Sequence, residues 1–380
     1  MEMRKVALFV ALSMALVLGL VQSFEFHERE LETEESLWDL YERWCSHHKV
    51  SRDPSEKQMR FRLFKDNAKY VLEFNKKDAP YKLELNKFSD MNEREKNVLS
   101  GYRLSRESRT QLRRRRGTVD DNFMYHHNKL IKDIPSSIDW REKGVVASVK
   151  DQGSCGSCWA FSTAAAVESI NKIVAGELVD LSPQQLIDCV TVGCDGCCGG
   201  YYGSAFEYIV NNNGITTLEN YPYAFKNLDW HCDHLKQNLT CQPSKVLSPL
   251  VTIDDFEEVP SNNESALKEA VAQQPVSVII DDSLLLLYKQ GIIVEPCGTN
   301  PNHGVTIVGY GTDTETGLDY WIVKNSRGAA WGENGYFRIQ RGISAEEGLC
   351  GIAMGSFYPI KSSTGISFIR AAESSLEDIH

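Results

Sequence analysis

A short loop rich in Gly and Ser turns directly into an apolar helix near the middle of the chain. The loop reads DQGSCGSCW over residues 151–159, and amphipathic spacing predicts a helix from Cys158 to Val174. Cys158 therefore lies at a helix N-terminus, where unpaired amide groups favour the thiolate form of a thiol. Because the thiolate is the nucleophilic form, the segment predicts a reactive cysteine fixed at a loop–helix junction.

The first 23 residues are typical of a secretory signal peptide. Arg4 and Lys5 precede an apolar run from Val6 to Leu20, and small or polar residues follow to Ser23. A membrane anchor needs about 20 apolar residues and a stop-transfer flank, and the segment provides neither. We expect entry into the secretory system, where the 11 cysteines can form disulfides, and no membrane association after signal removal.

Charge is distributed unevenly along the chain. Residues 1–133 hold 26 Lys and Arg against 22 Asp and Glu, whereas residues 134–380 hold 15 against 30. An acidic body excludes nucleic acid as a partner, because phosphate binding needs a basic surface. The basic run from Arg113 to Arg116 is therefore interpreted as a linker, and the opposite net charges favour contact between the two halves.

Composition and periodicity divide the chain into a signal peptide, a charged helical region, a mixed region and a polar tail, at residues 1–23, 24–133, 134–362 and 363–380. Apolar spacings of three and four predict two helices between Glu35 and Asn75, the second after Asp53-Pro54. Segments rich in β-branched and aromatic residues, broken by Gly, predict strands at 276–280, 304–311, 319–325 and 335–341. The mixed region is thus predicted to be α+β.

Three further side chains complete an apparatus for acyl transfer. His303, at the entrance to an apolar strand, is the base that we select among the nine histidines. Asn325 ends the segment DYWIVKN and is expected to orient the imidazole by accepting a hydrogen bond from its ring N–H. Gln152 can offer its side-chain amide, beside the Cys158 backbone N–H, as an oxyanion hole.

Redox or metal chemistry is the alternative interpretation of these cysteines. Two C-x-x-C pairs could form a redox centre or a zinc site, namely Cys155, Cys158, Cys194 and Cys197. A thioredoxin-like pair has its Trp before the first cysteine, whereas Trp159 follows the second. A zinc site leaves His303 and Asn325 without a role, so we expect no metal and no cofactor.

These motifs resemble those of the papain family of cysteine endopeptidases, in particular its plant-type members. The resemblance extends from residue 35 to 361, and C-G-S-C-W is the signature of the family's catalytic cysteine. Further motifs follow in the family's order, as CGGYYGSAF (198–206), NHGVTIVGYG (302–311) and WGENGYFRIQR (331–341). The resemblance implies a two-lobed fold, one lobe helical and one a β-barrel-like sheet, with Cys158 and His303 facing each other across the cleft.

The same resemblance implies a zymogen that matures by removal of an inhibitory pro-domain and hydrolyses peptide bonds through a Cys158 acyl-enzyme. The family's pro-domain signature falls on one helical face, at Glu56, Arg60, Phe64, Asn67, Val71 and Asn75. A second motif, G-x-N-x-F-x-D, is present as Glu84, Asn86, Phe88 and Asp90, with its glycine replaced. By resemblance this domain lies backwards through the cleft; our hypothesis is that its basic surface docks on the acidic body and loosens on acidification.

Disulfides are also implied by position in the family pattern. The implied pairs are Cys155–Cys197, Cys189–Cys232 and Cys297–Cys350. Cys194, Cys198 and Cys241 have no counterparts, and we expect Cys241 to pair with one of the other two.

One departure from the family concerns the segment after the candidate Asn. The family has N-S-W-G, and this chain has Asn325-Ser326-Arg327-Gly328. A cation there disfavours the imidazolium form of His303, which predicts reduced activity. An alternative function follows, a catalytically weakened papain-fold protein for storage, binding or defence. Asn302 also stands where many relatives have Asp.

Substrate recognition is predicted to involve backbone and apolar contacts. Gly199 and Gly200 would let an extended peptide pair with the main chain. An apolar pocket is implied by position at Tyr201, Tyr202, Ile279, Pro301, Gly304, Gly355 and Phe357. No carboxylate is expected at its floor, so we predict a bulky apolar or aromatic residue two places before the cut, and poor acceptance of Arg.

The remaining expectations concern modification, partners and location. Asn238 and Asn263 lie in glycosylation sequons. The chain ends LEDIH rather than K-D-E-L, and by analogy we expect a vacuole-like or lysosome-like acidic compartment, or secretion. Expected partners are protein and peptide substrates, the chain's own pro-domain and, by family analogy, cystatin-like inhibitors, with the mature protein a monomer.

Overall fold

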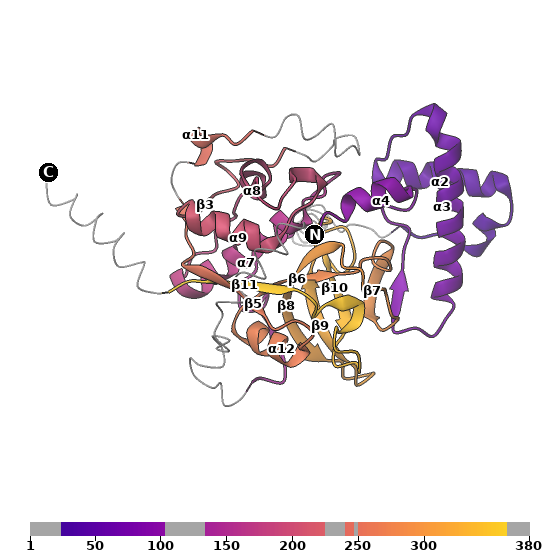
Figure 1. Ribbon diagram of the computed structural model, residues 1–380. Coiled ribbons are helices and arrows are strands. Elements are labelled where there is room, and N and C mark those ends of the chain that lie inside the picture. Colours follow the sequence, from indigo (N-terminus) through magenta and orange to yellow (C-terminus); the bar gives the residue numbers. More distant parts are fainter. Residues whose placement is uncertain (1–23, 103–133, 225–239, 247–249, 363–380) are drawn as a thin grey trace, which may run out of the picture.

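The computed structural model describes residues 24–102, 134–224, 240–246 and 250–362 (Figure 1). The predicted signal peptide, the C-terminal tail, the Arg113–Arg116 run and Asn238 lie outside these residues. A helical N-terminal domain stands beside a larger body of mixed helix and sheet. No helix among the described residues has both the length and the apolar character needed to cross a bilayer.

The N-terminal domain is built around two long helices. Its elements are η1 (Glu28–Leu31), α2 (Glu34–His48), α3 (Pro54–Asn75), β1 (Tyr81–Leu83) and α4 (Glu93–Leu99). Thr33 caps α2 by accepting a hydrogen bond from Ser36 N–H, and Asp53 caps α3 ahead of Pro54, which fits the first helical turn. Both predicted helices are therefore confirmed.

The signature face of α3 holds the following segment in place. Arg60 is buried and binds the Glu95 carboxylate, with Nη2 and Oε1 2.7 Å apart. Asn67 donates to the carbonyl oxygen of Ser89 at 2.8 Å, and Asn75 both donates to and accepts from the backbone of Leu83. These contacts fix residues 81–95 on α3, so that the chain leaving α4 is directed toward the body.

The body contains a helical part and a large sheet. The helices are α7 (Cys158–Ala175), α8 (Pro183–Cys189), η2 (Gly196–Cys198), α9 (Tyr202–Asn211), α11 (Pro243–Val246), α12 (Glu264–Gln273) and η3 (Leu349–Gly351). The strands are β2 (Ile138–Asp139), β3 (Ile215–Thr216), β4 (Leu250–Val251), β5 (Asp255–Val259), β6 (Val276–Ile280), β7 (Tyr288–Ile293), β8 (His303–Thr312), β9 (Asp319–Lys324), β10 (Tyr336–Gln340) and β11 (Ser356–Ile360). The four predicted strands are confirmed within a few residues.

The main sheet has the order β1-β7-β10-β9-β8-β6-β11-β5, with β2 paired to β8, while β3 and β4 pair separately. This path has two ends, so the described strands form an open sheet and no closed barrel, and the predicted α+β fold with a helical lobe and a sheet lobe is confirmed. β8 is central and buried along nearly its whole length, and α7 packs against it. The N-terminus of α7 is thereby brought to the start of β8.

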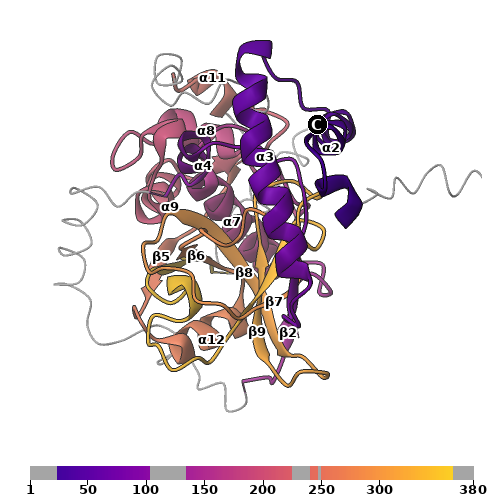
Figure 2. The same ribbon diagram turned by 90° about the vertical axis from the view of Figure 1, so that its right-hand side faces the viewer.

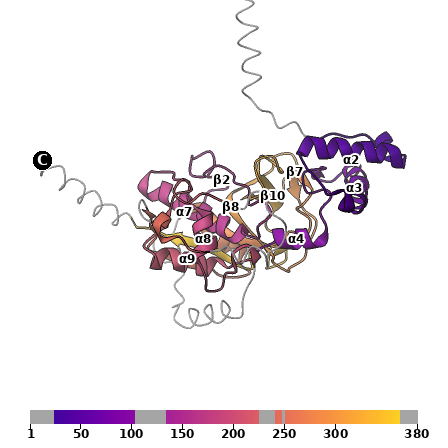
Figure 3. The same ribbon diagram turned by 90° about the horizontal axis from the view of Figure 1, so that it is seen from above.

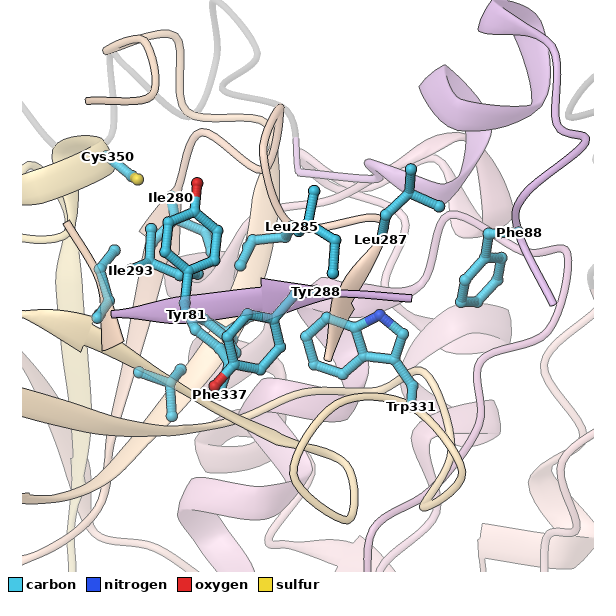
Figure 4. Close-up of a cluster of buried hydrophobic side chains, with 14 of the residues drawn as sticks. Tyr81, Phe88, Ile280, Leu285, Leu287, Tyr288, Ile293, Trp331, Phe337 and Cys350 are labelled. Carbon is cyan, nitrogen blue, oxygen red and sulfur yellow. The ribbon is translucent and has the colours of Figure 1, made fainter. Parts of the chain in front are cut away.

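The N-terminal domain docks by adding a strand to this sheet. β1 pairs antiparallel with β7, with Tyr81 opposite Gly291, and Asn86 Nδ2 donates to the carbonyl oxygen of Leu286 at 2.8 Å. Tyr81 and Phe88 lie among apolar side chains of the body, including Leu285, Leu287, Tyr288 and Trp331 (Figure 4). α3 crosses in front of the body near β7 (Figure 2), and α4 reaches from the helical domain toward the body (Figure 3). Main-chain pairing and apolar burial therefore both hold the domain in place.

The disulfides differ from the expected pattern at one pair. Cys155–Cys197 and Cys297–Cys350 are present as predicted. Cys189 bonds to Cys241, with Cα atoms 4.6 Å apart, so the predicted Cys189–Cys232 pair is wrong, and so is the expected pairing of Cys241 with Cys194 or Cys198. The end of α8 and the start of α11 meet in space, a proximity that sequence spacing does not reveal. Cys198 is also disulfide-bonded, and among the cysteines that the structure describes the free thiols are Cys45, Cys158 and Cys194.

Candidate active site

Cys158 is a free, fully buried thiol at the first residue of α7. The N–H of Gly304 lies 3.3 Å from its Sγ atom, and Gly304 directly follows His303. A Cβ at Gly304 would come within 3.3 Å of the Cys158 carbonyl carbon and would overlap the Tyr202 hydroxyl, so this close approach needs glycine. Cys158 therefore lies against the start of β8, the strand whose first residue is His303.

His303 and Asn325 form a buried pair at the ends of adjacent strands. His303 Nε2 lies 2.9 Å from Asn325 Oδ1. The same oxygen accepts the Ser326 N–H at 2.8 Å, which fixes the atom as oxygen, since a backbone N–H can only donate. His303 Nε2 must then donate its proton, and the lone pair of the neutral ring lies on Nδ1. That nitrogen has no hydrogen-bond partner among the described residues.

Gln152 is held by three hydrogen bonds next to the cysteine loop. Its Oε1 accepts from the Ser326 hydroxyl at 2.6 Å, and its Nε2 donates to the Cys155 carbonyl oxygen at 2.9 Å. Nε2 also donates at 3.0 Å to the carbonyl oxygen of Leu99, the last residue of α4. A backbone carbonyl of the N-terminal domain thus already occupies the amide that was predicted to stabilise an oxyanion.

Residues 99–102 of the N-terminal domain run through the site. Gly200 N–H donates to the carbonyl oxygen of Gly101 at 2.9 Å, and Tyr102 N–H donates to the carbonyl oxygen of Asn302 at 2.9 Å. Tyr102 and Gly200 form a parallel bridge, a sense that agrees with the predicted reversed direction, because a peptide running the other way would pair antiparallel with Gly200. A Cβ on Gly101 would overlap the Gly156 carbonyl oxygen, so only glycine passes there.

The side chain of Tyr102 fills the predicted apolar pocket. Its ring centroid lies 5.2 Å from that of Tyr202 and 6.2 Å from that of Tyr201, and it belongs to the same buried cluster as Ile279 and Phe357. Among the other predicted pocket residues, Gly355 packs on Ile279, Gly304 adjoins Tyr202, and Pro301 is half-buried. A side chain on Gly200 would collide with the Trp159 ring, and Gly199 has a φ of 118°.

One carboxylate near this pocket was missed. Glu258 is paired with Phe357 across β5 and β11. Burial raises the pKa of the Tyr102 hydroxyl well above its usual range, and after the neighbouring tyrosines the charge of Glu258 contributes to that rise. The period of two along β5, with Phe256 buried against Phe357, is the sequence signal that could have placed Glu258 on this face.

Arg327 is almost completely buried, at 1% exposure. Its Nη2 lies 2.6 Å from Oδ2 of Asp282, a residue that sequence reasoning missed, and the guanidinium carbon stands 5.5 Å from the Phe88 ring centroid and 5.8 Å from that of Trp331. The segment 325–328 runs antiparallel to residues 150–152, which directs Arg327 inward. The signal that could have pointed to Asp282 is that a buried cation such as Arg327 needs an anion beside it.

Both candidate catalytic groups are neutral in this state. Burial raises the pKa of Cys158 to about 11, against the opposing effect of the Gly304 and Gly101 N–H groups. Burial, followed by the charge of Arg327, lowers the pKa of His303 to about 4, and Asp282 partly offsets the shift. The thiol and imidazole therefore do not form an ion pair while the N-terminal domain covers them. Among the described residues, no group of three or more His, Cys, Asp or Glu side chains could hold a metal ion.

Comparisons with known proteins agree with this arrangement. A sequence model of the papain family cysteine proteases matches residues 134–360, and one of the cathepsin propeptide inhibitor domain (I29) matches residues 41–95. Vignain of Ricinus communis is 53% identical over 360 residues, covering 94% of this chain and 95% of that protein. A KDEL-tailed cysteine endopeptidase of Arabidopsis thaliana, CEP2, is 48% identical over 365 residues, covering 95% of this chain and 96% of that protein.

Solved structures are similar in the arrangement of both parts. The proform of the ragweed pollen allergen Amb a 11, a cysteine protease, superposes with a TM-score of 0.75 at 41% identity, covering 90% of this chain and 99% of that one. This neighbour also carries its propeptide.

Proposed function

The chain belongs to the papain family of cysteine proteases, as a cysteine endopeptidase with an inhibitory propeptide domain, and on that premise we propose that Cys158 is its nucleophile and His303 its base. The observation that carries the assignment is the Leu99 carbonyl on Gln152 Nε2. A main-chain carbonyl there lies where a scissile carbonyl would lie, beside a free thiol and the His303–Asn325 pair.

The chemistry follows from the hydrogen bonds. Once the pro-domain leaves, His303 Nδ1 takes the proton from Cys158 Sγ, and Asn325 keeps Nε2 protonated. The thiolate adds to the peptide carbonyl, and Gln152 Nε2 with the Cys158 N–H stabilises the resulting oxyanion. His303 then gives the proton to the leaving amine, the C–N bond breaks, and water hydrolyses the thioester with His303 again as the base.

The pro-domain acts as an intramolecular inhibitor, and we propose that electrostatic attraction contributes to its docking. Lys87 forms an ion pair with Asp151 of the body, next to Gln152. An exposed pair contributes about 0–1 kcal/mol, so strand pairing and apolar burial carry most of the affinity. High salt at neutral pH should therefore accelerate Cys158 alkylation in the zymogen modestly. No salt effect would remove the electrostatic part of the proposal.

The pocket filled by Tyr102 supports a preference for a bulky apolar or aromatic residue two places before the cut. Tyr201, Tyr202, Ile279 and Phe357 provide apolar and aromatic surface, and burial of one aromatic side chain there stabilises binding through removal of its area from water. Gly199 and Gly200 supply the main-chain partner.

The boundaries and the cellular setting are also proposals. The family matches at 41–95 and 134–360 support a pro-domain at 24–133 and a peptidase domain at 134–362, with 1–23 a signal peptide and 363–380 a tail. A secretory route is consistent with the KDEL-tailed relative; a vacuole-like or lysosome-like compartment, or secretion, is the finer proposal.

Asn263 is exposed and so accessible for glycosylation. Inhibition by cystatin-like proteins and a monomeric mature state follow from family analogy.

Labelling of Cys158 tests the assignment. A peptidyl epoxide should modify Cys158 after processing and not in the intact zymogen, as read by site-resolved mass spectrometry. The variant Cys158→Ala, processed by an added protease, should bind peptide without turnover. Turnover by that variant, or equal labelling before and after processing, would contradict the proposal.

A further inference from the structure

The buried pair of Arg327 and Asp282 borders the catalytic groups directly. Asp282 follows the end of β6 by two residues, and its N–H donates to Asn302 Oδ1 at 3.0 Å, beside His303. Arg327 lies two residues after Asn325. The 2.6 Å ion pair between them leaves both residues at least nine-tenths buried. Charges buried at this place need a reason beyond stability, because a buried ion pair contributes little net stability.

The pro-segment covers the pair and uses it. The Ser100 hydroxyl lies 3.1 Å from each carboxylate oxygen of Asp282 and 3.1 Å from the carbonyl oxygen of Lys96, so its one proton is shared among these acceptors. Phe88 covers the guanidinium of Arg327. When the pro-domain leaves, the Asp282 carboxylate loses its hydroxyl donor and faces the cleft, while Arg327 still holds Oδ2.

The position of Ser100 in the pro-segment shows which side of the cleft Asp282 borders. Leu99 places its carbonyl on Gln152, the Gly101 N–H approaches the Cys158 sulfur, and Tyr102 fills the apolar pocket. Ser100 precedes Tyr102 by two residues, which places it about 7 Å further along the segment at about 3.4 Å per residue. Asp282 therefore borders the leaving-group side, next to the imidazole that protonates the amine.

We propose that Asp282, held by Arg327, determines specificity for a hydroxyl-bearing residue, Ser or Thr, immediately after the cut. The proposal deepens, and rests on, the proposed function. A neutral hydroxyl can replace the donor that Ser100 provides now. An apolar side chain would cover the carboxylate without a donor, which is unfavourable. Lys or Arg gains little, because Arg327 already neutralises the carboxylate.

Matched peptides test the proposal with the processed enzyme. Substrates share one aromatic residue two places before the cut and differ only after it, as Ser against Ala and Thr against Val. We expect kcat/KM to favour the hydroxyl member by about fivefold to tenfold, the range of one hydrogen bond to a partly exposed charged group. Ratios near one in the wild type would overturn the proposal, and so would a preference for Asp or Glu, which would assign Arg327 as the contact.

Two variants separate the role of the pair from effects on folding. The double variant Asp282→Ala/Arg327→Trp removes both charges without leaving one buried alone, and its Ser/Ala ratio should fall to about one, within experimental error. The control variant Asp139→Ala/Arg141→Ala removes a partly exposed ion pair that makes none of the cleft contacts given above. It should retain the wild-type Ser/Ala ratio. A ratio unchanged in the first variant overturns the proposal. Absence of Cys158 labelling and of all turnover in the wild type would instead contradict the proposed function.

Discussion

The carbonyl oxygen of Leu99 lies 3.0 Å from Nε2 of Gln152. The amide that would stabilise an oxyanion is therefore occupied by the chain's own backbone, and the sulfur beside it is covered by Gly101. The pro-domain blocks catalysis by filling the site with a reversed segment rather than by displacing the catalytic groups. Inhibition should then depend on how closely residues 99–102 pack against the site, where a Cβ on Gly101 would already overlap the body.

Gly101→Ala should loosen this segment. The added Cβ would overlap the Gly156 carbonyl oxygen, and such overpacking costs about 1–3 kcal/mol. In the intact zymogen at neutral pH, alkylation of Cys158 by iodoacetamide should accelerate by about tenfold or more. Because Cys45 and Cys194 are also free, each site is quantified by mass spectrometry.

Lys96→Ala is the matched control for Gly101→Ala, since Lys96 lies on α4 and its partly exposed side chain pairs with the exposed Glu93, while its backbone contacts are kept. Its alkylation rate should equal that of the wild type. An unchanged rate of Cys158 alkylation in Gly101→Ala would contradict the prediction, because it would mean that the segment accommodates the added methyl group.

Local motifs were enough to predict the fold and to select the candidate catalytic groups, because the loop and helix at Cys158 and the apolar strand after His303 are both recognisable in short segments. Asp282 was missed because it meets Arg327 across 45 residues, and no local pattern marks that approach. The Cys189–Cys241 bond was missed for the same reason. The order of the strands at the ends of the sheet could not be predicted, because it depends on long-range pairing, including the strand that the pro-domain adds.

The pocket around Tyr102 predicts the substrate preference. Processed enzyme should cleave peptides with Phe or Leu two places before the cut about 10- to 100-fold better, in kcat/KM, than peptides with Arg, because a guanidinium there loses water among apolar side chains. Fluorogenic peptides measure the ratio. Equal turnover of the Arg peptide and the Phe or Leu peptides would contradict this prediction. If the variant Glu258→Gln then lost turnover of the Arg peptide, the contact with the substrate Arg would be assigned to Glu258.

Glu84 should make docking stronger as pH falls. Burial raises the pKa of its carboxyl from 4.5 to about 7, opposed by Lys289, so the docked state binds a proton more tightly than the released state. This contribution therefore strengthens docking as pH falls from about 7 toward 4.5, and it disfavours docking above pH 7. This effect of Glu84 is opposite in sign to the weakening of pro-domain docking at acidic pH that the overall charges of the two parts predict.

Glu84→Gln keeps the shape and removes the charge. At pH 8 the variant zymogen should be alkylated at Cys158 more slowly than the wild type, and at pH 4.5 the two rates should converge. Comparing variant and wild type at one pH cancels the pH dependence of thiol reactivity. Glu93→Gln, at an exposed position of α4, should match the wild type at both values, and faster alkylation of Glu84→Gln at pH 8 would reverse the assigned sign.

Removal of the Arg327–Asp282 pair should shift the pH profile. Activity through a thiolate–imidazolium pair is lost as pH rises through the pKa of His303, which gives the alkaline limb of kcat/KM. Arg327 lowers that pKa more than Asp282 raises it. Asp282→Ala/Arg327→Trp should therefore raise the His303 pKa and move the alkaline limb to higher pH, whereas a limb that stays in place or moves to lower pH would contradict the influence of Arg327.

The single variant Arg327→Trp separates charge from packing in this pair. It leaves the Asp282 carboxylate buried without its cation, which costs about 3–5 kcal/mol, while removal of both charges is close to neutral. Thermal unfolding should thus give a Tm well below the wild type for the single variant and near it for the double variant. Since the two variants share the same Trp, a low Tm in both would mean that the ring does not fit between Phe88 and Trp331, where the guanidinium now lies.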